Sequence, residues 1–274
     1  MLSAAEIAAY RNDGYRFPLD ILTPAETDAA RARLEAIEAA QGGPLKAAMR
    51  HKPHLLFPWL NTLIRHPRII DAVTDVLGPD ILCWSSTFFI KEAADRGFVS
   101  WHQDATYWGL SEPEVTTLWL ALTPATLANG CMKFIPGSHM RQVAHRDTFD
   151  PDNLLTRGQE LEVSVNEEEA VAVELAPGQA SLHHVLLFHG SAPNRSGARR
   201  IGLAIRYIPT RIRQIAGARD SATLVAGEDR FGHFDPEPAP EYDLAPEALA
   251  LHAAITERQQ AVLYRGTDRT AFRD

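Results

Sequence analysis

The sequence predicts a mainly β protein with flanking helices, built as an antiparallel barrel or a double-sheet jelly roll. From about residue 81 to 210 the chain consists of short β-branched and aromatic runs separated by turn residues. Seven or more such runs follow one another, which is typical of antiparallel all-β architectures. No helical pattern alternates with them, and this disfavours a parallel α/β sheet.

Helices are expected on both sides of this β region. Capping-box patterns at Ser3 with Glu6 and at Thr23 with Glu26 predict helices near 4–13 and 24–41. The segment HPRIIDAVTDVLG (66–78) predicts a shorter helix. We therefore expect one domain over 1–274, with a helical flank at 1–80, the β core at 81–210 and a C-terminal loop and helix at 211–274.

Composition narrows the class of partner. The formal net charge of −8 argues against a surface that neutralises nucleic-acid phosphates or an anionic membrane, so a small-molecule partner is favoured. No apolar run approaches the length of a membrane span. The two cysteines form no CxxC pair, and the N-terminus lacks a secretory layout, so we expect a cytoplasmic protein. The oligomeric state cannot be predicted.

The stretch WHQDATYW (101–108) is the first candidate site. In a continuous strand His102 and Asp104 would project from one face, separated by roughly 7 Å, and could meet one metal ion. An isolated HxD near a strand end can equally face solvent. By the same alternation Trp108 would share their face and wall a substrate pocket, although a plain core role is the alternative.

A second candidate lies in LLFHGSAPNRSGARRIGLAIRYIP (186–209), where two strands flank a turn-rich segment. A hairpin centred on Asn194 and Arg195 would place His189 opposite Arg200. Ser191 would then share the face of His189. Three polar side chains would converge on one patch.

The returning strand alternates between two kinds of residue. Ile201, Leu203, Ile205 and Tyr207 would pack a core, whereas Arg200, Gly202, Ala204 and Arg206 would form a small, cationic cavity floor. Arg206, and also Arg211 and Arg213, could attract an anionic substrate group or could be solvated surface charges. Three histidines, His51, His54 and His66, are expected at the surface or in a lid.

Two histidines and one carboxylate make up the facial triad that binds non-haem Fe(II), and His102, Asp104 and His189 supply this set. The open positions of such an ion could take a 2-oxo acid and then O₂. The far carboxylate of that acid needs a fixed cation, for which Arg200 is the candidate with Ser191 as a second donor.

The motifs HxD (102–104), NGCMKFIPGSH (129–139) and FHGSAPNRSGARR (188–200) resemble the phytanoyl-CoA dioxygenase family of Fe(II)- and 2-oxoglutarate-dependent oxygenases. The resemblance implies a double-stranded β-helix, that is a cupin-like jelly roll. It also implies iron ligands at His102, Asp104 and His189, and a 2-oxoglutarate site at Arg200 and Ser191. Lys91 and Thr117 resemble positions that touch the co-substrate in some members.

The implied function is hydroxylation of an unactivated C–H bond of a small metabolite, with release of succinate and CO₂ and with O₂ as oxidant. Asp104 disfavours halogenation, because related halogenases carry a small residue at this position. Desaturation, cyclisation and epimerisation stay open. The alternatives are a cupin-like metalloprotein, acting as an isomerase or a 2-oxo-acid-independent oxygenase, and a catalytically idle binding module.

Overall fold

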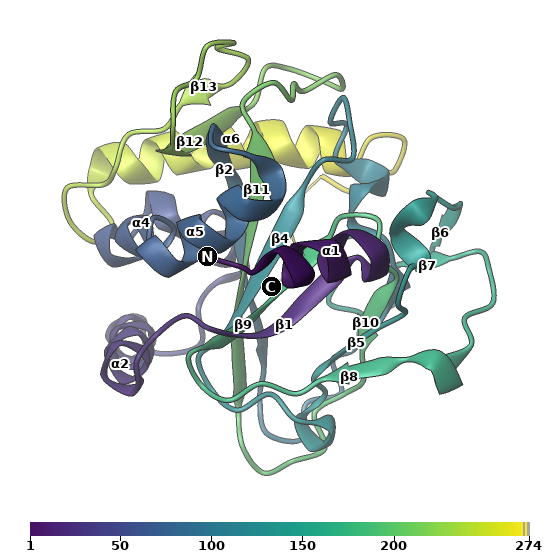
Figure 1. Cartoon of the computed structure of the whole chain (residues 1–274). Helices are drawn as coiled ribbons and strands as arrows, with labels where there is room; N and C mark the ends of the chain where they lie inside the picture. The colour runs from purple at the N-terminus through teal and green to yellow at the C-terminus, as the bar shows by residue number, and fades with distance from the viewer. Residues whose placement is uncertain (271, 273–274) are drawn as a thin grey trace.

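The computed structural model describes residues 1–270 and 272, and it contains two facing β-sheets with a layer of helices outside the larger one (Figure 1). The larger sheet has the order β1-β9-β4-β11-β2-β12-β13, with bounds β1 (Tyr15–Asp20), β9 (Gln179–His184), β4 (Thr116–Ala121), β11 (Arg200–Pro209), β2 (Ile81–Lys91), β12 (Ser221–Ala226) and β13 (Asp235–Pro236). The smaller sheet has the order β3-β10-β5-β8, with bounds β3 (Val99–His102), β10 (His189–Ser191), β5 (Met132–Phe134) and β8 (Val171–Val173). β6 (His145–Asp147) and β7 (Gln159–Leu161) form a separate hairpin. Neighbouring strands are antiparallel except for β12 and β13, so the fold is the expected jelly roll.

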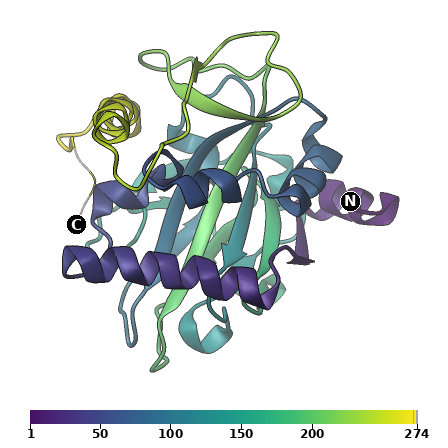
Figure 2. The ribbon, with the colours of Figure 1, turned by 90° about the vertical axis from the view of Figure 1, so that its left-hand side faces the viewer.

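The helices predicted near 4–13, 24–41 and 66–78 begin and end close to where the sequence predicts, whereas the short helices α3 (Ala47–Arg50) and α4 (Pro58–Leu63) were not predicted. The bounds of the others are α1 (Ala4–Asp13), α2 (Pro24–Gln41), α5 (Pro67–Leu77) and α6 (Pro246–Leu263). Both capping boxes are formed, because Ser3 and Thr23 each exchange hydrogen bonds with the glutamate three residues later. Figure 2 shows α2, α4 and α5 lying across one face of the larger sheet. Within the described residues, no helix combines the length and apolarity that crossing a bilayer requires.

Strand β11 separates the two layers of the core. Ile201, Leu203, Ile205 and Tyr207 pack against the helices in the main hydrophobic cluster, as predicted. The alternate residues Arg200, Ala204 and Arg206 face the smaller sheet and line a pocket between the sheets. Gly202 faces the same way and must lack a side chain, because an added Cβ would lie 1.9 Å from the Trp119 ring.

Two expectations about chain path are wrong. The helical flank of residues 1–80 contains strand β1, which pairs with β9 at the edge of the larger sheet. Pro18 lies inside β1, and a proline argues against a central strand because it has no backbone N–H to donate. An edge strand such as β1 tolerates this loss.

The predicted hairpin around Asn194 does not form, since β10 and β11 lie in different sheets. Residues 192–199 cross between the sheets. The Asn194 amide anchors this crossing by donating to the Glu92 carbonyl at 2.7 Å and to the Ala198 carbonyl at 2.8 Å. His189 is consequently paired with His102 and not with Arg200.

A buried ion pair ties the C-terminal region to the N-terminal layer. Lys52 Nζ lies 2.5 Å from Glu237 Oε1, and both side chains are almost fully buried. Ser221 and Thr223 each donate to the same carboxylate at 2.7 Å. His54 lies 3.3 Å from it and is fully buried, contrary to its expected place at the surface. Burial alone would raise the pKa of Glu237, but Lys52 and His54 together outweigh burial and lower it.

Glu237→Ala should destabilise the fold strongly, because it leaves the Lys52 ammonium buried without a counter-ion. We expect a loss of about 3–5 kcal/mol in the free energy of unfolding, measured by urea denaturation. The control is Glu228→Ala, which removes an exposed partner of Arg230 and should change stability by about 0.5 kcal/mol or less. Equal losses in the two variants would contradict a structural role for the buried pair.

Candidate metal centre and adjoining cavity

Three candidate ligands converge between the sheets. His102 ends β3, His189 begins β10, and these two residues lie directly opposite each other in the antiparallel pair. Asp104 opens the short 3₁₀ helix η2 (Asp104–Tyr107), just beyond β3. One potential ligand atom from each of the three lies within 4.8 Å of the others, and all three residues are buried.

The path that brings Asp104 to the site differs from the predicted one. The chain leaves the strand after His102, so alternation along a continuous strand does not explain why the two side chains meet. Instead the Asp104 amide donates to the Val185 carbonyl at 3.0 Å, which holds the 3₁₀ turn against the end of β9. The carboxylate Oδ1 then lies 3.2 Å from His102 Nε2 and 3.9 Å from His189 Nε2.

Backbone carbonyls orient both imidazoles. His102 Nδ1 lies 2.9 Å from the Ser100 carbonyl and 3.0 Å from the His189 carbonyl. His189 Nδ1 lies 2.9 Å from the Leu187 carbonyl. A carbonyl accepts only from a protonated nitrogen, so Nδ1 is the donor in both rings and Nε2 is the nitrogen that faces Asp104 and the centre of the site.

The protonation states suit a cation. Burial lowers the pKa of His189 well below its ordinary value, so the ring is neutral and able to coordinate. Burial would raise the pKa of Asp104, but the hydrogen bond with His102 and the charge of Arg206 outweigh it and hold the pKa well below the usual range. Two imidazole nitrogens and one carboxylate oxygen fit a divalent metal such as Fe(II).

An inner pocket beside these candidates is lined by three of the four predicted co-substrate residues, and the fourth, Lys91, contacts one of them. Arg200, Ser191 and Thr117 line it, together with the three metal-ligand candidates. Arg200 is 1% exposed and lies opposite Lys91 in the β11–β2 pairing. Lys91 Nζ donates to Ser191 Oγ at 2.8 Å and also to the Ala192 carbonyl.

Several buried polar atoms in this region have no partner in the described residues. They are Arg200 Nε, Thr117 Oγ1 and His183 Nδ1. Arg200 Nη1 donates to the Gly130 carbonyl, but no ion pair is formed by Arg200 or Lys91 within residues 1–270 and 272. A buried guanidinium, a neighbouring lysine amine that can take up a proton and an unpaired hydroxyl therefore fit a small dianion such as a dicarboxylate.

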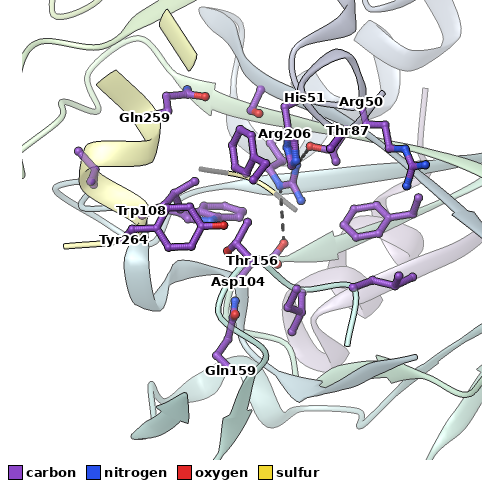
Figure 3. A pocket seen from close by; sticks show the side chains of 18 of the residues that line it. Arg50, His51, Thr87, Asp104, Trp108, Thr156, Gln159, Arg206, Gln259 and Tyr264 are labelled. Carbon is purple, nitrogen blue, oxygen red and sulfur yellow. Dashed lines mark hydrogen bonds and ion pairs between the residues drawn. The ribbon is translucent and has the colours of Figure 1, made fainter. Parts of the chain in front are cut away.

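An outer cavity of about 240 Å³ adjoins the metal-ligand candidates (Figure 3). Asp104 and Arg206 line both the inner pocket and this cavity. Trp108 also lines this cavity, with the Arg206 guanidinium carbon 5.0 Å from the centre of its ring. Trp108 was expected to line a pocket, and it does so. It is positioned by the 3₁₀ helix η2, however, and not by alternation along a strand. Arg211 and Arg213 do not line the cavity; Arg211 forms an exposed ion pair with Glu114.

Sequence reasoning missed the part of the cavity wall that comes from distant segments. His51 follows α3 and its pKa is lowered to about 3, chiefly by burial and then by the charge of Arg206, so its ring is neutral. Gln259 and Tyr264 come from α6 and the residue just after it. A C-terminal helix was predicted within residues 211–274, but the sequence did not show which segments it would pack against.

The comparisons agree with this geometry. The chain is 38% identical to the solved non-heme monooxygenase ThoJ in its apo form, with a TM-score of 0.84 and coverage of 94% of this chain and 96% of that one. It is 25% identical to CytC3 with Fe(II) and alpha-ketoglutarate, with a TM-score of 0.63 and coverage of 89% and 96%.

Among curated proteins, the chain is 32% identical over 158 residues to a probable alpha-ketoglutarate-dependent hypophosphite dioxygenase of Stutzerimonas stutzeri. The match covers 57% of this chain and 54% of that relative, so the chain spans about half of the relative's length. The phytanoyl-CoA dioxygenase (PhyH) family model matches residues 2–202. This match covers most of the chain and includes all three metal-ligand candidates, and the chain belongs to the phytanoyl-CoA dioxygenase family.

Proposed function

We propose that this protein is an Fe(II)- and 2-oxoglutarate-dependent dioxygenase that hydroxylates an unactivated C–H bond of a small metabolite and releases succinate and CO₂. The observation that carries the proposal is the convergence of His102, Asp104 and His189, with both Nε2 atoms directed at one point. The related CytC3 was solved with Fe(II) and alpha-ketoglutarate, which supports the same pair of cofactors.

In this proposal His102 Nε2, His189 Nε2 and an Asp104 oxygen hold Fe(II). The bound metal and 2-oxoglutarate supply the activation of O₂. The protein contributes fixed ligand geometry, because each imidazole is held by a backbone carbonyl through its Nδ1. Burial of all three residues limits the access of water to the ligand atoms.

Arg200 would hold the distal carboxylate of 2-oxoglutarate, with Ser191 and Thr117 as hydroxyl partners. Arg200 comes from β11 and Ser191 from β10, so one ligand would bridge the two sheets. Lys91 would contribute charge through its contact with Ser191. Trp108 and Arg206 would contact the second substrate from the outer cavity.

The alternatives account for fewer of these features. A metalloprotein that uses no 2-oxo acid keeps the three ligands but leaves the buried Arg200 guanidinium, which has no ion pair in the described residues, without a role. An idle binding module gives no reason for the oriented imidazoles. We therefore favour the dioxygenase, acting on a small molecule in the cytoplasm.

His189→Ala should weaken metal binding by more than about 100-fold, because it removes one of only three protein ligands. The measurement is isothermal titration with Mn(II) in the absence of O₂. The matched control is His139→Gln, which removes a buried imidazole whose Nε2 contacts the Arg11 carbonyl, outside the three-ligand cluster. Unchanged affinity in His189→Ala would contradict the assignment of this ligand.

Arg200→Ala should weaken 2-oxoglutarate binding by about 3 kcal/mol, or more than 100-fold, because a buried guanidinium–carboxylate pair is lost. Succinate release with Fe(II) should fall correspondingly at low co-substrate concentration. The control is Arg199→Ala, the neighbouring residue, whose guanidinium pairs with Glu38 on α2 and with Glu92. It should leave 2-oxoglutarate binding unchanged, and an equal effect of both substitutions would refute the role of Arg200.

Binding of 2-oxoglutarate should weaken as pH rises above about 6. Burial and the nearby Arg200 lower the pKa of Lys91 to about 6, so the free protein loses this proton above that pH. A bound dianion favours the ammonium form, and binding must then take up a proton, which costs at most tenfold in affinity per pH unit. Calorimetry in buffers of different ionisation enthalpy measures the proton uptake, and Lys91→Met should abolish it. A pH-independent wild-type affinity between pH 6 and 9 would contradict this role.

A further inference from the structure

The outer cavity contains a buried cation without a matching acceptor. Arg206 is 8% exposed, and its Nη1 donates to Thr87 Oγ1 at 2.9 Å. Its Nε has no hydrogen-bond partner in the described residues. A guanidinium carries five N–H donors, so most of this group's hydrogen-bonding capacity is left for a ligand. A buried charged group with unmet donors is costly unless something else supplies the acceptors.

Asp104 does not serve as that acceptor. Its Oδ2 lies 3.9 Å from Arg206 Nε, which is an ion pair at long range and beyond hydrogen-bond length. The other carboxylate oxygen, Oδ1, faces the two imidazoles. Arg206 therefore stabilises the charge of Asp104 at a distance, while its remaining N–H groups stay available.

Two other arginines line the cavity. Arg50 is only partly buried, and it donates through Nε to the Leu45 carbonyl at 2.8 Å. Arg258 Nη1 pairs with Asp235 at 3.2 Å. The Asp220 carboxylate accepts from Trp84 Nε1 at 2.8 Å and from Gln259 Nε2 at 3.0 Å. Of these groups, Arg206 combines burial, positive charge and the absence of a close carboxylate partner.

Aromatic side chains define the rest of the space. The Trp84 and Trp108 rings pack 4.9 Å apart, and Phe89 also lines the cavity. The guanidinium of Arg206 lies over Trp108, so the anion site and the aromatic wall are contiguous. The volume of about 240 Å³ is smaller than the 300–1,000 Å³ of sites for drug-sized ligands, and suits a metabolite.

We propose that the substrate is a small carboxylate with an apolar or aromatic body, whose carboxylate pairs with Arg206 while the body lies against Trp84 and Trp108. The inference rests on the proposed dioxygenase function, and it names the substrate class of that site. Because Arg206 adjoins Asp104, the carbon presented to the metal would lie close to the carboxylate along the molecule. The guanidinium thus sets both the affinity and the position of attack.

The test uses two probes of equal shape, 3-phenylpropionate and 3-phenylpropanamide. They are titrated into the full chain loaded with Fe(II) and saturating 2-oxoglutarate without O₂, so that the Arg200 site is already filled. Quenching of tryptophan fluorescence reports binding beside Trp84 and Trp108. Wild type should prefer the carboxylate at least tenfold, Arg206→Gln should bind both probes equally, and Arg206→Lys should restore part of the preference.

Arg258→Gln is the matched control, since it removes another cavity arginine that is already paired with Asp235; it should keep the preference. Equal affinities in wild type, failure of both probes to bind, or a preference that persists in Arg206→Gln would overturn the proposal. The charge-transfer absorption of the Fe(II)–2-oxoglutarate complex is recorded for every variant. Its absence in wild type would refute the proposed function instead, and its loss only in Arg206→Gln would show that Arg206 serves the metal ligands and not the substrate.

Discussion

The antiparallel pairing of β3 with β10 is the constraint on which the rest of the site depends. It places His102 directly opposite His189, although the two are 87 positions apart in the sequence. The same pairing supplies the His189 carbonyl that orients the His102 ring. Because the second sheet is only four strands wide and its members are short, this ligand geometry relies on the larger sheet and on the core between the sheets for support.

Groups of opposite charge lie around His102 and His189. The Asp104 carboxylate lies beside the two imidazoles, with Arg206 on one side. Arg200 lines the inner pocket beyond, and Lys91 lies opposite it in the β11–β2 pairing. An incoming metal and a dianionic co-substrate would balance these charges within a buried volume. The unpaired polar atoms of the free protein are therefore understandable as a preformed site, in which the cost of desolvation is met during folding and not during binding.

Local sequence patterns predicted the parts of the fold that depend on neighbours in the chain. The capped helices and the alternation along β11 were confirmed, because both arise from interactions within one element. The three metal-ligand candidates lie together as expected, but through a 3₁₀ turn at Asp104 and not through a continuous strand. The hairpin around Asn194 was wrong because a turn-rich segment does not reveal whether its two strands pair with each other. His51 and the α6 residues were missed for the same reason: tertiary contacts bring them to the cavity.

Arg200 and Arg206, which we assign to 2-oxoglutarate and to the substrate, both project from strand β11. They are six residues, or roughly 20 Å, apart along the strand. Because an even number of residues separates them, both side chains point to the same face of the sheet. The bulge in the pairing with β2 follows immediately after Arg206. Insertion or deletion of one residue between them would turn one guanidinium away into the apolar helical layer. Evolution of new specificity in this scaffold should thus proceed by exchanging side chains on the surrounding walls, while the length of this segment stays fixed.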